Sequence, residues 1–111
     1  SSQRVRDISR IQSRRIDQVV PIPMHWRLGY HRVFTMGPRT PNAFGHFGFQ
    51  GSGAWCDPTR HLAVGFIVNT SGGTTPFGDD RIARINAQAI RAAEKVEGVR
   101  SPRFGLVPFL N

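Results

Sequence analysis

A glycine-rich stretch at residues 44–55 holds the residues whose types and spacing are best suited to chemistry. Glycine lacks packing surface and loses more backbone entropy than other residues, so several glycines in an extended segment indicate a backbone that a ligand or another strand approaches closely. A glycine-bulged edge strand explains the same pattern. Within the stretch, His46 carries an imidazole, which can donate or accept a hydrogen bond. The alternative for His46 is a polar strand residue that faces solvent.

Segments within this stretch and on both sides of it occur in a recognisable order. They are His46-Phe47-Gly48, the bend and strand at 51–58, the apolar strand at 62–69, the triplet Leu28-Gly29-Tyr30 and the segment entering it at 23–26. This order resembles the third conserved motif and the flanking strands of class C β-lactamases, D-alanyl-D-alanine peptidases and family VIII carboxylesterases. The resemblance covers about residues 1–97. It implies the C-terminal portion of a β-lactamase-like fold of the α+β class.

By this resemblance, the motif forms one wall of an acyl-transfer site. The backbone N–H of Phe49, directly after Gly48, takes the place of an oxyanion donor, and such a donor lowers the barrier by about 3 kcal/mol. His46 takes the place of the family's Lys or His, where it would stabilise developing negative charge and make activity sensitive to pH. Phe47 replaces the usual Thr or Ser, whose hydroxyl helps hold a substrate carboxylate, so a neutral acyl ester is favoured over a penicillin.

The resemblance also implies a substrate pocket with walls formed by Phe47, Tyr30 and Trp55. Aromatic residues at strand spacing more often belong to a hydrophobic core, which is the alternative for these side chains. No cofactor is implied. The substrate class implied is a small ester or amide.

The nucleophile that the family needs is absent from this sequence. Its mechanism uses a Ser with a Lys three residues later and a Tyr-x-Asn, whereas the single lysine, Lys95, follows Ala92, and Tyr30 is followed by His31 and Arg32. Without an activated nucleophile, covalent acyl transfer has no starting group. The chain alone is therefore predicted to be inactive, and its partner is the missing N-terminal catalytic portion of the same protein. A non-catalytic scaffold of the same fold is an alternative.

A basic balance supports a different alternative, a module that binds nucleic acid. The chain has 15 basic and 7 acidic residues, a net charge of +8, and eight of its arginines precede residue 40. Positive charge alone is a weak signal, and no stacking aromatic lies between Arg4 and Arg15. A contact with nucleic acid is therefore not the preferred prediction. The lone Cys56 excludes an internal disulfide, and the histidines have no metal-ligand spacing.

Composition bounds the remaining possibilities. With 111 residues, 39% hydrophobic and 20% charged, the chain is predicted to form one small domain, and it has no run of roughly 18 apolar residues that would span a membrane. No apolar stretch follows the charged N-terminus, so a secretory signal is not expected there. A cytoplasmic or cell-associated location is the corresponding expectation.

The elements that must position the motif follow from periodicity. We expect three parts: a helix and connector at 1–20, a body of antiparallel strands with a closing helix at 21–98, and a tail at 99–111. Apolar spacing predicts an amphipathic helix over 4–16. Alternation predicts a strand over 25–36, with Trp26, Leu28 and Tyr30 on one side and Arg27, Gly29 and His31 on the other.

Three further strands and a final helix complete the expected fold. The strands are predicted at 43–50, 54–56 and 62–68, with turn chemistry between them, so they form an antiparallel meander. The helix begins at Asp79 or Asp80 and ends at Gly98. Its apolar stripe, which is expected to face the sheet, consists of Ile82, Ile85, Ala89, Ile90, Ala93 and Val96.

Overall fold

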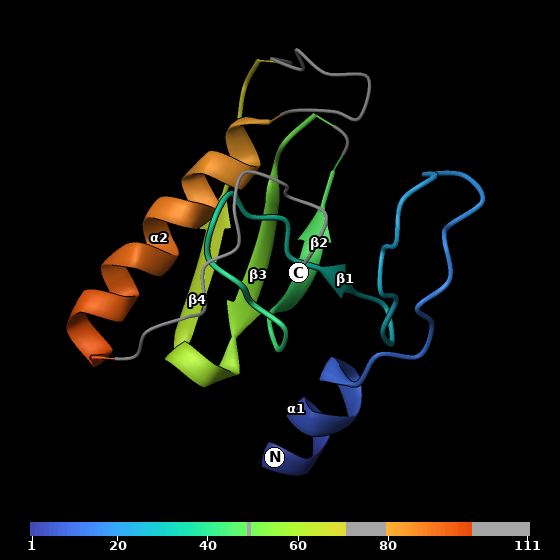
Figure 1. The fold of residues 1–111 in the computed structure, drawn as a ribbon, viewed down its shortest axis with the longest axis horizontal. Coiled ribbons are helices and arrows are strands. Elements are labelled where there is room, and N and C mark those ends of the chain that lie inside the picture. The colour runs from blue at the N-terminus through green and yellow to red at the C-terminus, as the bar shows by residue number, and fades with distance from the viewer. Residues whose placement is uncertain (49, 71–79, 99–111) are drawn as a thin grey trace.

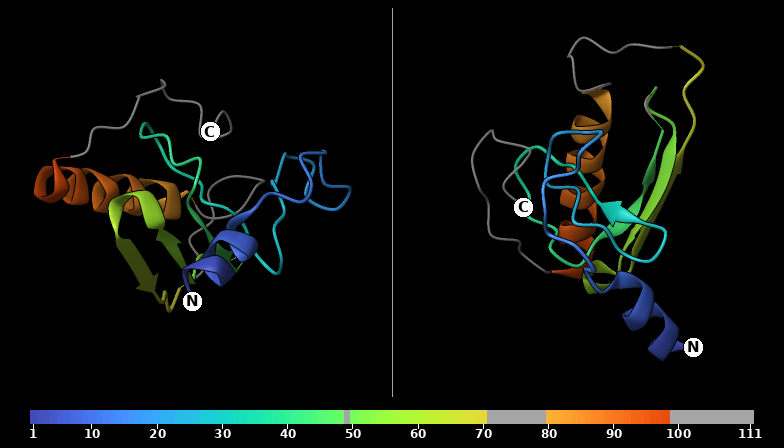
Figure 2. Two further views of the ribbon diagram at one scale, coloured as in Figure 1. Left: turned by 90° about the horizontal axis from the view of Figure 1, so that it is seen from below. Right: turned by 90° about the vertical axis from the view of Figure 1, so that its right-hand side faces the viewer.

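The computed structural model describes residues 1–48, 50–70 and 80–98. Its elements run in the order α1 (Ser2–Ser9), β1 (His31–Arg32), β2 (Phe44–Phe47), β3 (Gly53–Asp57), a short 3₁₀ turn (Pro58–Arg60), β4 (Leu62–Phe66) and α2 (Arg81–Glu97). Figures 1 and 2 show α2 lying against one face of the sheet, and α1 lies apart from α2, at the bottom of the molecule in Figure 1. The predicted α+β class is confirmed. The predicted tail at 99–111 and most of the loop at 69–78 lie outside the described residues.

The sheet is an antiparallel meander of four strands in the order β1-β2-β3-β4, as the alternating pattern predicts. Along one cross-strand row, Gly45 of β2 lies opposite Trp55 of β3, which lies opposite Val64 of β4. In the next row, His46 lies opposite Ala54 and Ala54 opposite Gly65. Because side chains alternate along a strand, these two rows belong to opposite faces of the sheet.

The two faces have different chemistry. The inner face, which packs on α2, carries Trp55, Leu62, Val64 and Phe66, and Trp55 belongs to a buried cluster with Val33, Ala43 and Ile90. The outer face carries small side chains between β2 and β4: Ala54, Cys56, Ala63 and Gly65. Burial of the large apolar side chains on the inner face supplies the hydrophobic stabilisation of the fold.

Helix α2 begins and ends close to where the sequence predicts. Asp80 precedes its first residue, and Gly98 ends it in the left-handed region at a φ of 68°, with its N–H bonded to Glu94 O. The expected apolar stripe is partly wrong. Ile85 is 42% exposed and Val96 is 83% exposed, whereas the buried positions are Ile82, Ala83, Asn86, Ala87 and Ile90.

The buried face of α2 is displaced because it is organised around a polar residue. Asn86 is fully buried, accepts a hydrogen bond from Trp55 Nε1 at 2.7 Å and donates to Phe34 O at 3.0 Å. These two bonds satisfy the amide inside the core, so its burial is tolerated. An apolar pattern alone does not reveal such a residue.

The predicted N-terminal elements are shorter than expected. Helix α1 ends at Ser9 instead of residue 16, because Gln12 N and Ser13 N donate to Trp26 O at 2.7 and 3.2 Å and the segment pairs with Trp26. The strand predicted over 25–36 is reduced to His31–Arg32. His25 at a φ of 50° and Gly29 at a φ of 80° interrupt the extended backbone.

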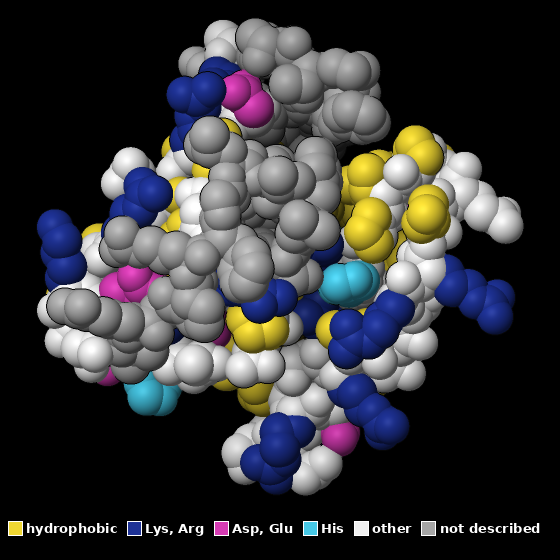
Figure 3. All heavy atoms as spheres, viewed as in Figure 1, with side chains coloured by type: hydrophobic (Ala, Val, Ile, Leu, Met, Phe, Trp, Pro, Cys, Tyr) yellow, Lys and Arg dark blue, Asp and Glu magenta, His cyan; other side chains and the backbone are white. Residues whose placement is uncertain are grey.

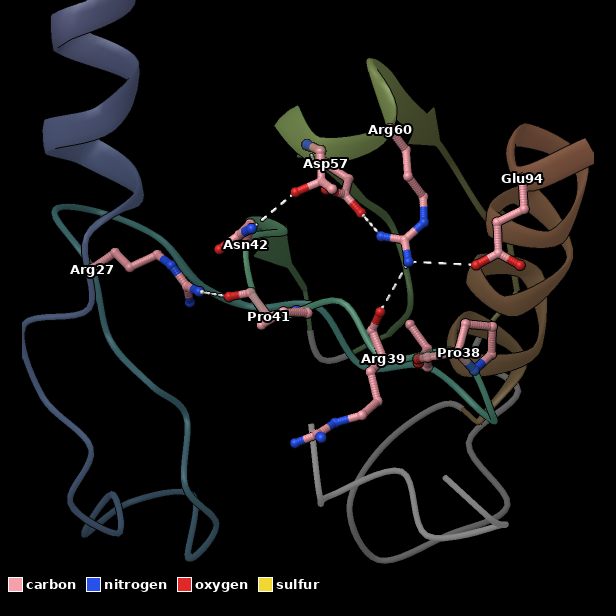
Figure 4. Close-up of polar contacts among 10 residues, drawn as sticks. Arg27, Pro38, Arg39, Pro41, Asn42, Asp57, Arg60 and Glu94 are labelled. Carbon is pink, nitrogen blue, oxygen red and sulfur yellow. Dashed lines mark hydrogen bonds and ion pairs between the residues drawn. The ribbon is translucent and has the colours of Figure 1, made fainter. Parts of the chain in front are cut away.

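A buried arginine connects the turn after β3 to α2 and to the segment before β2 (Figure 4). Arg60 is paired with Asp57 through a short contact and lies 3.4 Å from a carboxylate oxygen of Glu94. Its guanidinium also donates to Arg39 O at 3.1 Å. Both Asp57 and Arg60 are at most 4% exposed. Arg60 thus connects its own turn to Arg39 and to Glu94, both of which lie more than 20 residues away in sequence.

No helix in the described ranges is long and apolar enough to cross a bilayer.

Replacing Arg60 with Leu is expected to lower the free energy of unfolding by about 3 to 5 kcal/mol, because it leaves the buried Asp57 carboxylate without its cation. Urea denaturation of the chain measures this loss. The matched control is Arg84→Leu, since Arg84 forms a 3.3 Å pair with Asp80 on an exposed part of α2. That change is expected to cost about 0.5 kcal/mol. Equal losses in the two variants would contradict the role of Arg60.

Candidate functional site

His46 lies in β2 on the outer face of the sheet, and its side chain is exposed. Its cross-strand neighbours in the same row, Ala54 and Gly65, are both small. The imidazole ring is therefore open to a ligand above the outer face. Its ring lies against that of His31, with centroids 5.3 Å apart in an edge-to-face arrangement.

A glycine turn follows the motif and joins β2 to β3. Gly48 N donates to Ser52 O at 2.8 Å, and Gly51 N donates back to Gly48 O at 3.0 Å. Gly51 has a φ of 107°, a conformation that side chains disfavour, which explains the need for glycine there. The predicted oxyanion donor, Phe49, lies outside the described residues.

The predicted pocket residues do not share one face. Tyr30 lies on the outer side, where its ring is 5.4 Å from that of Phe44. Phe47 points to the inner face, packs on the core cluster and lies 6.1 Å from the ring of Phe66. Trp55 is 3% exposed and bonded to α2, so it too belongs to the core side. Of the three, only Tyr30 shares the face of His46.

An open groove of about 530 Å³ runs along the outer face. Its lining is mostly apolar and comes from α1, Tyr30 and strands β2 to β4, including Val5, Ile8, Phe44, Cys56 and Ala63. Ala54 and Gly65, the row neighbours of His46, also line it. The groove therefore reaches the row of His46 and offers an apolar surface beside a titratable side chain.

The close approach of β2 and β3 explains why residue 45 is a glycine. A Cβ atom added to Gly45 would overlap the carbonyl oxygen of Ala54 and the Cα and Cβ atoms of Trp55. Glycine at this position lets β2 and β3 lie together beneath the outer face. The prediction of a closely approached backbone is confirmed at Gly45, with a strand as the approaching element.

His31 is a residue of the site that the sequence does not single out. Alternation places it with Arg27 on the side opposite Tyr30, and its spacing suggests only a surface or strand histidine. The structure buries both, with His31 2% exposed and Arg27 6% exposed, while Leu28 is 55% exposed. The ring of His31 accepts a hydrogen bond from Phe47 N at 3.2 Å. It thereby contacts the motif directly.

Two of the arginines, Arg27 and Arg32, are buried and make contacts inside the fold. Arg27 donates to three backbone oxygens, those of Ser9, His25 and Pro41, at 2.8 to 3.1 Å. Figure 4 shows the contact with Pro41. Arg32 is 3% exposed, lies over the ring of Phe34, and burial lowers its pKa to about 10. Figure 3 shows that the remaining dark blue side chains outnumber the acidic ones on one face. These two buried arginines do not serve a nucleic-acid contact.

Metal and thiol chemistry find little support. Among the residues that the structure describes, no group of three or more His, Cys, Asp or Glu side chains is placed to hold a metal ion. Cys56 is partly buried, and burial together with the neighbouring Asp57 raises the pKa of its thiol. A raised pKa leaves less of the nucleophilic thiolate at neutral pH.

Comparisons of the chain with protein-family models, with curated proteins and with solved structures found no match.

Gly45→Ala is expected to lower the free energy of unfolding by about 1 to 3 kcal/mol, because the added methyl group forces β2 and β3 apart. Gly65→Ala is the matched control on the same sheet, since its nearest neighbour would be Ala54 Cβ at 3.9 Å. A change within about 0.5 kcal/mol is expected for the control. Urea denaturation measures both, and an unchanged Gly45→Ala variant would contradict the close approach.

Proposed function

We propose that this chain is the C-terminal part of a serine hydrolase of the β-lactamase-like superfamily, which cleaves small esters through an acyl-enzyme. The observation that carries the proposal is the placement of His46. It is exposed beside an apolar groove, on the first long strand of an antiparallel meander closed by a helix. That order of elements is the one implied by the resemblance of the sequence motifs.

The outer face is the surface on which the missing catalytic portion would dock. Helix α2 packs on the inner face and is bonded there to Trp55. We expect a serine carried by another segment to approach from the opposite side, where His46 is exposed. The small side chains Ala54, Ala63 and Gly65 allow a close approach of that segment to the sheet.

In the proposed reaction, the missing portion supplies the serine, and this chain supplies a hydrogen-bond donor. The serine hydroxyl of the missing portion attacks the ester carbonyl, its proton passes to a neighbouring base, and the alcohol leaves as the acyl-enzyme forms. Water then hydrolyses the acyl-enzyme and restores the serine. This chain supplies His46, which donates a hydrogen bond to negative charge that develops near the serine.

An ester is preferred to a β-lactam because the described residues that line the groove are mostly apolar. At position 47 the family usually carries Thr or Ser, whereas Phe47 packs on the core and offers a substrate carboxylate no hydroxyl. The groove beside His46 is lined by Val5, Ile8, Tyr30 and Phe44, which favour an apolar acyl chain. A carboxylate placed there without a polar partner loses several kcal/mol of hydration that nothing replaces.

In the complete protein that includes this chain, His46→Asn is expected to lower kcat/KM for p-nitrophenyl butyrate about a hundredfold, because it removes a titratable hydrogen-bond donor from the site. His61→Asn is the control, since His61 lies at the β3–β4 turn with its side chain 81% exposed. Asparagine tolerates the positive φ of that position. Unchanged turnover in His46→Asn would remove His46 from the mechanism.

The same complete protein is expected to hydrolyse p-nitrophenyl butyrate with a kcat/KM about a hundredfold or more above that for nitrocefin. The reason is the cost of placing the β-lactam carboxylate against an apolar lining. Initial rates at several substrate concentrations give both constants. The reverse preference would contradict the esterase assignment and leave β-lactam hydrolysis as the better description.

A further inference from the structure

His31 occupies an edge position that backbone pairing leaves open. Strand β1 has two residues and pairs only with Phe44 and Gly45 of β2. Beyond that pairing, the N–H of Phe47 donates to Nε2 of His31 at 3.2 Å. The imidazole therefore takes the place of the next strand residue along the edge of β2. The backbone N–H that it contacts belongs to Phe47, the residue between His46 and Gly48.

The hydrogen bonds of His31 define its tautomer. Nδ1 lies 2.8 Å from Arg32 O, and a carbonyl oxygen only accepts, so Nδ1 carries the proton. Nε2 is then the acceptor that Phe47 N requires. Both bonds exist together only in the neutral ring with the proton on Nδ1. A doubly protonated ring has no lone pair for Phe47 N–H.

The surroundings of His31 favour that neutral state. Four rings pack around it, those of Trp26, Phe34, His46 and Phe47, with centroids 5.3 to 5.9 Å away. Burial is the largest cause that lowers its pKa. The hydrogen bond to the Arg32 carbonyl, the next cause in size, raises it, and the charges of His46 and Arg27 lower it further. A proton on this ring is therefore disfavoured in the folded chain.

We propose that neutral His31 is a positioning residue, which holds the backbone of Phe47 and so fixes the direction in which His46 projects from β2. Its importance for turnover rests on the proposed function, whereas its hold on the Phe47 amide does not. Protonation of His31 breaks the bond to Phe47 and releases this part of the edge. The site then loses its geometry at acid pH.

The sign of the pH dependence follows from the lowered pKa of His31. In the unfolded chain the ring takes up a proton as the pH falls through about 6.5, while the folded ring resists it. The stability contributed by neutral His31 is thus fully present above that pH. It is lost progressively as the pH falls towards the lower value of the folded state.

The test uses ¹⁵N-labelled chain and two variants. His31→Phe keeps a ring of similar size without nitrogen atoms, and His31→Gln keeps an acceptor that does not titrate. Hydrogen exchange of the Phe47 amide is expected to be about tenfold faster in His31→Phe, relative to the Ile90 amide of α2, and near the original rate in His31→Gln. In the unsubstituted chain, imidazole ¹⁵N shifts are expected to place the proton on Nδ1 at neutral pH.

Two results would overturn the proposal. One is a proton on Nε2 at neutral pH. This measurement uses the unsubstituted chain, so it does not depend on whether a variant folds. The other is equal relative exchange of the Phe47 amide in His31→Phe, His31→Gln and the original chain, which would leave His31 a packing residue only.

A second readout uses the complete hydrolase, in which His31→Gln is expected to flatten the acid limb of the kcat/KM profile. An unchanged acid limb would overturn the link to the site. Failure of the complete protein to hydrolyse esters would count against the proposed function alone, because the amide exchange and the tautomer are measured without turnover.

Discussion

The hydrogen bond between Trp55 and Asn86 is the interaction on which the arrangement of the sheet and α2 depends. It joins the central strand to the middle of the helix at 2.7 Å, inside a core where both residues are at most 3% exposed. Its net contribution is only about 1 kcal/mol, but a different rotation of α2 would bury a polar group without a partner at greater cost. The bond therefore selects one helix face out of several that the apolar pattern allows. With that face chosen, the outer side of the sheet is left as the side that is open.

The open side explains why small residues are concentrated between β2 and β4. A sheet that buried both faces within this chain would carry large apolar side chains on each. Here the paired residues Trp55 and Val64 place large side chains on the inner face. The next pair, Ala54 and Gly65, places only a methyl group on the outer face. A face of that kind is suited to close contact with another segment, and it is also where His46 is exposed. The division of the sheet into a bulky and a small face is thus the structural basis for assigning a partner and a site to the same side.

Sequence reasoning predicts the elements with strong local periodicity and fails where distant hydrogen bonds decide. The meander and α2 follow from period and termini, so their order and approximate bounds agree with the structure. The segment at 25–32 does not, because Arg27 is buried by three backbone acceptors, one of them at Pro41, 14 residues away. The same reasoning treats His31 as a surface or strand histidine, whereas the structure buries it, since its acceptor role at Phe47 depends on a pairing 16 residues away. A polar residue that satisfies a distant backbone group leaves no signal in its own neighbourhood.

Consecutive residues of β2 connect the core to the site. Because strand side chains alternate, Phe47 packs on Phe66 inside while His46 stands on the outer face. Gly45 is pressed against β3 on one side, and the amide of Phe47 is held by His31 on the other. The backbone from which His46 projects is therefore constrained from three directions by groups that are not exposed. In the proposed hydrolase, where the imidazole of His46 meets a nucleophile carried by another segment, such constraint reduces the entropy lost on reaching the reactive geometry.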